Sequence, residues 1–328
     1  MPENIENMKG LVMRSTGSWY EVLAEDGKAM QCRVRGKLRL EGIKETNPIA
    51  VGDHVSFNIE NNEACLPALR TTWGGGPDRQ GIIHEILPRE NYIVRQSVKK
   101  TGHAHVIAAN IDQAMLMATL IQPRTSLGFI DRFLVAAESF RIPQAIIFNK
   151  KDLLDKETFL EQGELMELYE RVGVRCLEIS ALEERQEEVR NLLKGKITLL
   201  AGLSGVGKST LLNKLAPTID QKTSEISDYS EKGTHTTAFA EMFRLDENTF
   251  IIDTPGIKEF GLIDMGKEEL SDYFPEMREL RLNCKFGSRC IHVNEPKCII
   301  LEAVKSGAIA TSRYDSYYSM VMGEDNRK

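Results

Sequence analysis

The stretch AGLSGVGKST, residues 201–210, decides the class of fold. It contains the pattern G-x-x-x-x-G-K-[ST] without a gap. The apolar run ITLLA precedes the pattern and the run TLLNKL follows it, which is the strand–loop–helix context that a phosphate loop needs. The alternative, an ordinary glycine-rich turn, does not explain this full match in its context. Glycines at these positions let backbone N–H groups close around phosphate oxygens.

Each residue of this loop has an expected role. Lys208 can reach the β- and γ-phosphates of a nucleotide, which makes it the loop's candidate catalytic residue, and the Ser209 hydroxyl can ligate Mg²⁺. The expected nucleotide contacts in the loop are Gly202, Leu203, Ser204, Gly205, Val206, Gly207, Lys208, Ser209 and Thr210.

A second phosphate motif, DTPG at 253–256, ends the apolar run TFIID. We expect Asp253 to hold Mg²⁺ through water and the Gly256 N–H to contact the γ-phosphate. The pattern D-x-x-G is common, and a plain turn at the end of a strand is the alternative. Its position at a strand end, after the phosphate loop, favours the nucleotide interpretation.

Between these motifs lies EKGTHTT at 231–237, where Thr236 and Thr237 are both candidates to close on Mg²⁺ and Thr237 is slightly preferred. Ile257 follows DTPG, where Ras-like enzymes have a glutamine that orients the attacking water. An apolar side chain cannot do this, so we expect slow hydrolysis that needs outside help. His235 is the internal candidate for positioning the water, and the alternatives are a loop histidine or an RNA contact.

A base-reading motif, NKKD at 149–152, follows the apolar run QAIIF. The Asp152 carboxylate can accept hydrogen bonds from guanine N1–H and its amine, which selects GTP over ATP. Asn149 is expected at the guanine N7 edge, and the Lys150 stem over the ring. EISA at 178–181 is typical of the supporting loop, in which Ser180 and Ala181 lie near guanine O6. Each of these two motifs is weak evidence alone.

The order of the motifs is reversed relative to the usual G-protein chain, since NKKD precedes the phosphate loop. Each motif nevertheless ends a predicted strand, and open α/β sheets bind ligands at the carboxyl ends of their strands. Short continuous apolar runs alternate with helical patterns over residues 97–262, which predicts a doubly wound α/β domain. A P-loop ATPase or kinase is an alternative that NKKD argues against.

Residues 1–96 read as short strands separated by turns and predict a small β-barrel. In CRVRGKLRL at 32–40, cations recur at every second position, and alternate side chains share one face of a strand. A solvated strand face is the alternative, but four cations on one face suit a nucleic-acid backbone. The candidate RNA-binding residues are Arg33, Arg35, Lys37 and Arg39.

Residues 263–328 look helical and contain CKFGSRCIHVNEPKC at 284–298. Three thiolates and one imidazole form a closed tetrahedral set, as structural zinc prefers. Unligated buried cysteines are the alternative. The candidate ligands are Cys284, Cys290, His292 and Cys298.

Composition sets limits on the function. The net charge of −6 argues weakly against a nucleic-acid partner, although residues 1–100 are almost neutral, with 14 basic and 13 acidic residues. No apolar run is long enough to span a membrane, and the N-terminus has no apolar signal core. We therefore expect a cytoplasmic protein without a membrane partner.

The motif order NKxD, SA, phosphate loop, threonine loop and DTPG, flanked by CRVRGK and the Cys/His cluster, resembles the RsgA family, also called YjeQ or YloQ. AANIDQ at 108–113, FIDRFLVAAE at 129–138 and KGTHTT at 232–237 are similar to family signatures. The resemblance implies an OB-fold domain over 1–96, a circularly permuted GTPase domain over 97–262 and a helical zinc domain over 263–328. One departure is the gap between Cys284 and Cys290, which holds one residue more than the family pattern.

The resemblance also implies a monomer that uses GTP/GDP, Mg²⁺ and one structural Zn²⁺. It implies binding to the small ribosomal subunit and its rRNA, GTP hydrolysis stimulated by that subunit, and release of the assembly factor RbfA. An RNA-binding structural module with a GTP/GDP-sensing but weakly hydrolytic G domain is the alternative, and Ile257 is the feature that supports it.

Overall fold

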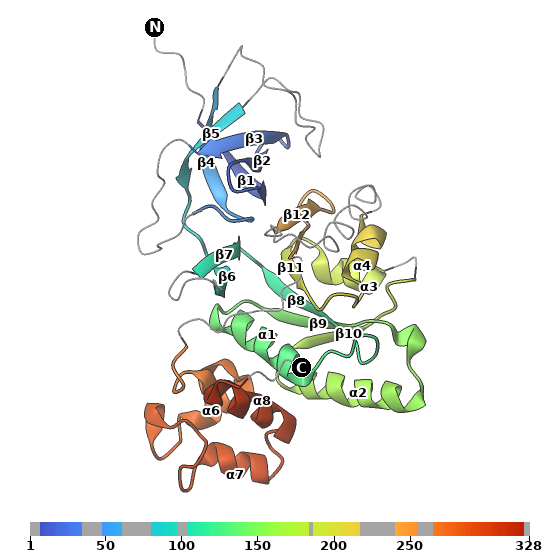
Figure 1. The fold of residues 1–328 in the computed structure, drawn as a ribbon, viewed down its shortest axis with the longest axis vertical. Coiled ribbons are helices and arrows are strands. Elements are labelled where there is room, and N and C mark those ends of the chain that lie inside the picture. Colours follow the sequence, from blue (N-terminus) through green and yellow to red (C-terminus); the bar gives the residue numbers. More distant parts are fainter. Residues whose placement is uncertain are drawn as a thin grey trace. The chain divides into compact units, whose positions relative to one another are not determined.

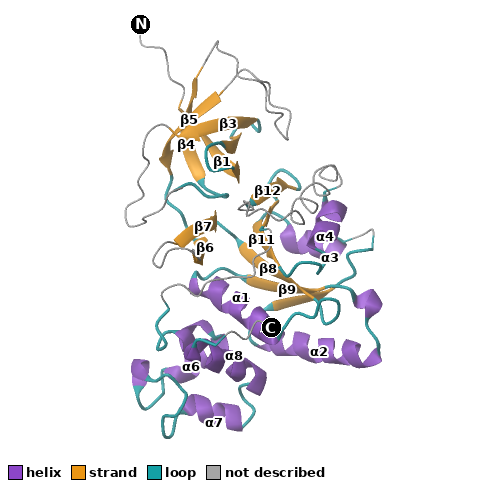
Figure 2. Ribbon diagram, in the orientation of Figure 1, coloured by secondary structure: helices purple, strands orange, loops and turns teal. Residues whose placement is uncertain are grey.

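The computed structural model describes residues 7–34, 48–60, 80–96, 104–183, 186–216, 240–254 and 265–324. The chain divides into two compact units (Figure 1). The first contains Met1–Asp112, Gly195–Leu199 and His235–Pro255, and the second contains Gln113–Lys194, Leu200–Thr234 and Gly256–Lys328. Among the described residues, the regular structure of the first unit consists of strands, and the helices belong to the second unit (Figure 2).

Five strands of the first unit close into a barrel, in the order β1–β2–β3–β5–β4 with β4 returning to β1. Val12, Val22, Phe57 and Ile83 are fully buried inside it, because alternate residues of each strand point inward. The predicted N-terminal barrel is therefore confirmed. The strands are β1 Asn7–Ser15, β2 Tyr20–Ala24, β3 Ala29–Val34, β4 His54–Glu60 and β5 Gln80–Ile86.

The basic strand predicted over CRVRGKLRL is described only at its beginning. Arg33 is exposed near the end of β3. Arg35, Lys37 and Arg39 lie outside the described residues, so the cationic strand face remains a prediction.

The barrel is joined to the rest of the first unit by buried polar contacts. The Arg89 guanidinium makes two hydrogen bonds to the fully buried Asp53 carboxylate, at 2.7 and 2.8 Å. Asn110, in the AANIDQ signature, donates to the Gly52 carbonyl at 2.9 Å. A Cβ at Gly52 would lie 2.1 Å from the Ala109 oxygen, so the backbones meet where only glycine fits.

Four further strands of the first unit form two antiparallel pairs. These are β6 Tyr92–Gln96 with β7 Ala104–Ala109, and β12 Glu241–Arg244 with β13 Phe250–Asp253. β12 continues the barrel sheet, because Glu241 pairs with Arg14 of β1.

The second unit contains three parallel strands in the order β10–β9–β8. All six residues of β8 are buried, which explains its unbroken apolar sequence. β11 Ile197–Ala201 begins in the first unit and ends in the second. The other elements are β8 Gln113–Ala118, α1 Leu127–Ser139, β9 Gln144–Phe148, η1 Lys151–Leu153, α2 Lys156–Arg171, β10 Arg175–Glu178, α3 Glu187–Leu193 and α4 Lys208–Leu215. The predicted α/β architecture is confirmed.

The C-terminal part of the second unit is helical, as predicted, and Figure 1 shows it beside α1. Its core consists of Phe274, Met277, Ile300, Tyr317 and Val321 packed around three buried cysteines. The elements are η3 Leu270–Tyr273, α6 Pro275–Arg281, η4 Gly287–Arg289, α7 Ile299–Lys305 and α8 Thr311–Met322. Among the described helices, none is long and apolar enough to cross a membrane.

A buried ionic cluster joins this helical part to α1 and α2. Arg313 of α8, only 1% exposed, donates to Asp131 of α1 at 2.5 Å and to Glu276 of α6 at 2.7 Å. The Tyr169 hydroxyl of α2 donates to the same Asp131 oxygen at 3.0 Å. The guanidinium also lies 4.7 Å from the ring centroid of Phe274. One cation thus holds four helices together.

Replacing Arg313 should strongly destabilise the protein. Arg313→Ala leaves Asp131 buried without its cation, and breaking such a buried pair costs about 3–5 kcal/mol. Arg124→Ala is the control, because it breaks an exposed ion pair with Glu161 that contributes about 0–1 kcal/mol. Urea denaturation of the full chain gives both values. A loss below about 1 kcal/mol for Arg313→Ala would contradict the assigned role of the cluster.

Candidate functional site

The phosphate loop has the backbone geometry that its glycines predict. Gly202, Gly205 and Gly207 have φ values of +153°, +82° and +107°, a region that disfavours side chains. Gly207 immediately precedes α4, so the N–H groups of the first turn of that helix open toward the loop. The Lys208 ammonium lies on the loop itself and donates to the carbonyls of Gly202 and Leu203, at 2.8 and 3.0 Å.

Two of these glycines also allow close packing. A Cβ at Gly202 would lie 2.5 Å from the Met117 carbonyl oxygen of β8. A Cβ at Gly207 would lie 2.3 Å from the side-chain nitrogen of Asn149. The loop is therefore pressed against the carboxyl end of β8 and against the NKKD motif.

Asn149 connects three of the predicted motifs. Its Nδ2 donates to the Val206 carbonyl of the phosphate loop at 2.7 Å, and its Oδ1 accepts from the Ala181 N–H at 2.8 Å. The side chain is buried, with Asn149 only 2% exposed. NKKD, the Ser180–Ala181 loop and the phosphate loop are thus parts of one site, although NKKD precedes the phosphate loop in the chain.

The other residues of the base-reading motif lie beside this contact. Lys150 is left-handed, with φ +68°, and its ammonium donates to the Gln122 carbonyl. Asp152 lies in η1 and is exposed, so its carboxylate is accessible to a ligand. Ser180 is buried, and its carbonyl accepts from the Gln186 amide at 2.8 Å.

Two contributors to this site were missed in the sequence. The Gln122 carbonyl lies in the turn after β8, and no sequence pattern marks a backbone acceptor. Gln186 holds the Ser180–Ala181 loop through a buried amide. Its only sequence signal is a glutamine shortly after EISA, which is too common to single out.

The remaining nucleotide residues are only partly placed. Asp253 is the last residue of β13 in the first unit. His235, Thr237 and Gly256 lie outside the described residues. Their predicted roles, and the predicted Mg²⁺ ligation by Ser209, Thr237 and Asp253, stay predictions.

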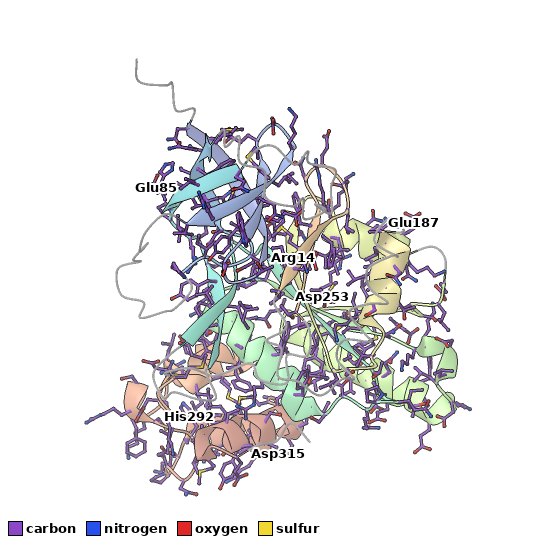
Figure 3. All side chains as sticks on the ribbon, turned by 45° about the horizontal axis from the view of Figure 1, so that its top comes forward. Arg14, Glu85, Glu187, Asp253, His292 and Asp315 are labelled. Atoms are coloured by element: carbon purple, nitrogen blue, oxygen red, sulfur yellow. The ribbon has the colours of Figure 1, made fainter. Side chains whose placement is uncertain are left out.

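Cys284, Cys290, His292 and Cys298 come together in the C-terminal part, where their ligand atoms all lie within 4.8 Å of one another. Figure 3 labels His292 in this part of the chain. The Cys298 sulfur lies 3.9 Å from that of Cys284, 4.0 Å from that of Cys290 and 3.2 Å from His292 Nδ1. A tetrahedral ion with Zn–S bonds of about 2.3 Å keeps neighbouring sulfurs about 3.8 Å apart. The cluster therefore fits zinc.

The electrostatics of the cluster also suit a metal. All four ligands are buried, and burial lowers the pKa of His292, which favours the neutral imidazole that binds metal. A closed set of three sulfurs and one nitrogen leaves no position for a substrate. The site is therefore structural in kind.

The backbone around the cluster is held by a carboxylate and two tyrosines. Glu295 accepts hydrogen bonds from the N–H groups of Ile291, Val293 and Asn294, at 2.8, 2.8 and 3.0 Å. The Tyr314 and Tyr317 hydroxyls donate to the carbonyls of His292 and Ile291, each at 2.8 Å. The segment between Cys284 and Cys290, with its additional residue, turns at Gly287, where φ is +56°.

Asn149 of NKKD joins the phosphate loop to the Ser180–Ala181 loop, and NKKD precedes the phosphate loop in the chain. This arrangement defines the chain as a P-loop protein of the GTPase class. Residues 86–263 match the family model described as RsgA GTPase, and residues 9–66 match the RsgA N-terminal domain. The chain belongs to the RsgA GTPase family.

Similar proteins cover the whole length. Small ribosomal subunit biogenesis GTPase RsgA of Christiangramia forsetii is 48% identical over 97% of both chains, and that of Bacteroides fragilis is 46% identical over 98% of both. Among solved structures, YjeQ from Thermotoga maritima is 32% identical with a TM-score of 0.72, covering 98% of this chain and 100% of that one. YloQ, described as a circularly permuted GTPase, is 29% identical with a TM-score of 0.70, covering 100% and 98%.

Removing the Glu295 carboxylate should loosen the metal loop. Glu295→Ala leaves three N–H groups without this acceptor, and we expect a stability loss of about 1–3 kcal/mol and faster zinc loss to a chelator. Glu279→Ala, at an exposed position of α6, is the control. Zinc release to a colorimetric chelator measures the effect, and equal rates for the two variants would contradict it.

Removing the Asn149 side chain should weaken guanine-nucleotide binding. Asn149→Ala leaves the buried Val206 carbonyl and Ala181 N–H without their partner, and each such loss costs about 1–3 kcal/mol. We expect affinity to fall by roughly tenfold to hundredfold in a titration with a fluorescent GDP. Asn283→Ala, at an exposed position in the C-terminal part, should bind as the parent does. Unchanged affinity for Asn149→Ala would refute its role in organising the site.

Proposed function

We propose that this protein is a GTP hydrolase that binds the small ribosomal subunit, assists its late maturation and is stimulated by that subunit. The observation that carries the proposal is the double hydrogen bond of Asn149, because it joins the base-reading motif to the phosphate loop. Full-length similarity to proteins named small ribosomal subunit biogenesis GTPase supports the cellular role.

The proposed substrate contacts follow the motifs. Asp152 reads the guanine edge, the Lys150 stem lies over the ring, and the Ser180–Ala181 loop contacts the base oxygen. Asn149 is expected at the purine N7 edge in addition to its two protein contacts. The backbone from Gly202 to Thr210 holds the phosphates, and Lys208 moves from the loop carbonyls to the β- and γ-phosphates.

Ser209, Thr237 and Asp253 would hold Mg²⁺, which neutralises charge on the phosphates, and Gly256 would contact the γ-phosphate. His235 is the proposed group for positioning the attacking water, because Ile257 cannot do so. The four ligands Cys284, Cys290, His292 and Cys298 would hold one structural Zn²⁺, which stabilises a segment with a small core.

The proposed organisation is an OB-fold domain over 1–96, a permuted GTPase domain over 97–262 and a zinc domain over 263–328. Arg33, Arg35, Lys37 and Arg39 would contact rRNA from the barrel. The proposal also includes release of RbfA, a monomeric state and a cytoplasmic location. These three points are supported by the family resemblance.

A second candidate is an RNA-binding module whose G domain senses GTP or GDP but scarcely hydrolyses GTP. Ile257 favours it, because the usual water-orienting glutamine is absent after DTPG. Single-turnover hydrolysis with and without purified small subunits separates the two candidates.

We expect slow GTP hydrolysis alone and a large acceleration by small subunits. Lys208→Ala should abolish the accelerated rate, since it removes the cation that neutralises the β- and γ-phosphates. For that experiment Lys214→Ala, near the end of α4, is the control.

Excess unlabelled GTP should displace a labelled guanine nucleotide, whereas excess ATP should not. Equal rates with and without subunits would favour the sensing module, and displacement by ATP would refute the assigned base specificity.

A further inference from the structure

The segment between the first two metal ligands, Lys285–Arg289, forms an exposed loop. Every one of its residues is exposed, whereas Cys284 and Cys290 at its ends are buried in the metal cluster. Backbone hydrogen bonds tighten it, from Gly287 N–H to Cys284 O at 2.9 Å and from Cys290 N–H to Gly287 O at 3.2 Å. A loop fixed at both ends loses little conformational entropy when it binds a partner.

This loop carries an aromatic ring between two cations. Phe286 is 40% exposed, although phenylalanine is usually buried. The Lys285 ammonium lies 5.8 Å from the Phe286 ring centroid. Arg289 follows at the end of η4. Exposed rings of this kind stack on unpaired bases, and neighbouring cations meet the phosphates.

Among the described residues, no ion pair neutralises the two cations beside the ring. Both side chains are exposed, and the structure records no carboxylate partner for Lys285 or Arg289 in the described part of the chain. Glu295, the acidic residue of the metal loop, is engaged by three backbone N–H groups. Glu279, on α6, is the nearest preceding acidic residue. In a chain of net charge −6, this cationic surface favours a polyanion over an ordinary protein surface.

We propose that Phe286 is a stacking platform for an unpaired RNA base, with Lys285 and Arg289 binding the adjacent phosphates. The metal cluster fixes the ring in position, which gives the structural zinc a role in RNA recognition. This inference rests on the proposed ribosomal function and assigns the C-terminal loop a contact distinct from the basic strand of the barrel.

The test compares variants of the full chain on deproteinised small-subunit RNA and on intact small subunits, at several salt concentrations. Phe286→Leu keeps an apolar side chain but removes the aromatic face, and Phe286→Trp keeps that face. Leu160→Ala, an exposed apolar position on α2, is the matched control. Lys285→Gln with Arg289→Gln is compared with Lys156→Gln with Arg171→Gln, a pair of exposed cations on α2. Zinc content and GDP affinity verify that each variant is folded.

We expect Phe286→Leu to weaken RNA binding about tenfold and Phe286→Trp to retain it. Lys285→Gln with Arg289→Gln should reduce the magnitude of the slope of log affinity against log salt by about 1.4, because each lost cation contributes roughly 0.7 on single-stranded RNA. RNA binding by Phe286→Leu equal to that of the parent would overturn the proposal. The proposal would also be overturned if Phe286→Leu bound intact subunits more weakly but bound free RNA as the parent does, because that result would show a contact with a ribosomal protein. A parent chain that bound RNA but neither GTP nor subunits would contradict the proposed function, while the RNA comparison would still decide the stacking role.

Discussion

The nucleotide site depends on a single buried amide. Asn149 follows the buried strand β9, and its side chain donates to the phosphate loop and accepts from the Ser180–Ala181 loop. Gly207 must lack a side chain for that amide to fit. The permuted chain order therefore does not disturb the site, because the contact depends on where strands end in space rather than on which strand comes first.

The C-terminal part combines two ways of stabilising a small core. A metal cluster with its Glu295-supported loop fixes the segment from Cys284 to Cys298, and a buried arginine fixes the helices. The two are linked through α8, since Tyr314 and Tyr317 hydrogen-bond the metal loop while Arg313 bonds Asp131 of α1. The metal loop is consequently held against the α/β part of the same unit by one helix.

Motifs and apolar periodicity predicted the barrel, the parallel strands and the four metal ligands, because each depends on local sequence. The buried contacts between distant segments were not predictable in this way. Asp131 and Arg313 are ordinary charged residues in sequence, and only their burial reveals that they pair. The dual hydrogen bonding of Asn149 was likewise missed, since the motif suggests a ligand contact and says nothing about Val206. The basic strand face stays a prediction, because Arg35, Lys37 and Arg39 lie outside the described residues.

The Arg313–Asp131 contact spans 182 residues and has a consequence for synthesis. A chain is synthesised from its N-terminus to its C-terminus, so α1 leaves the ribosome long before α8 does. Until Arg313 has been synthesised, folding would bury the Asp131 carboxylate of α1 without a cation, and burying an unpaired charge is costly. A nascent or prematurely terminated chain should therefore remain open around α1 and be accessible to chaperones and proteases. Because Asp131 takes its cation from α8, α1 can reach the packing described here only after α8 has been synthesised.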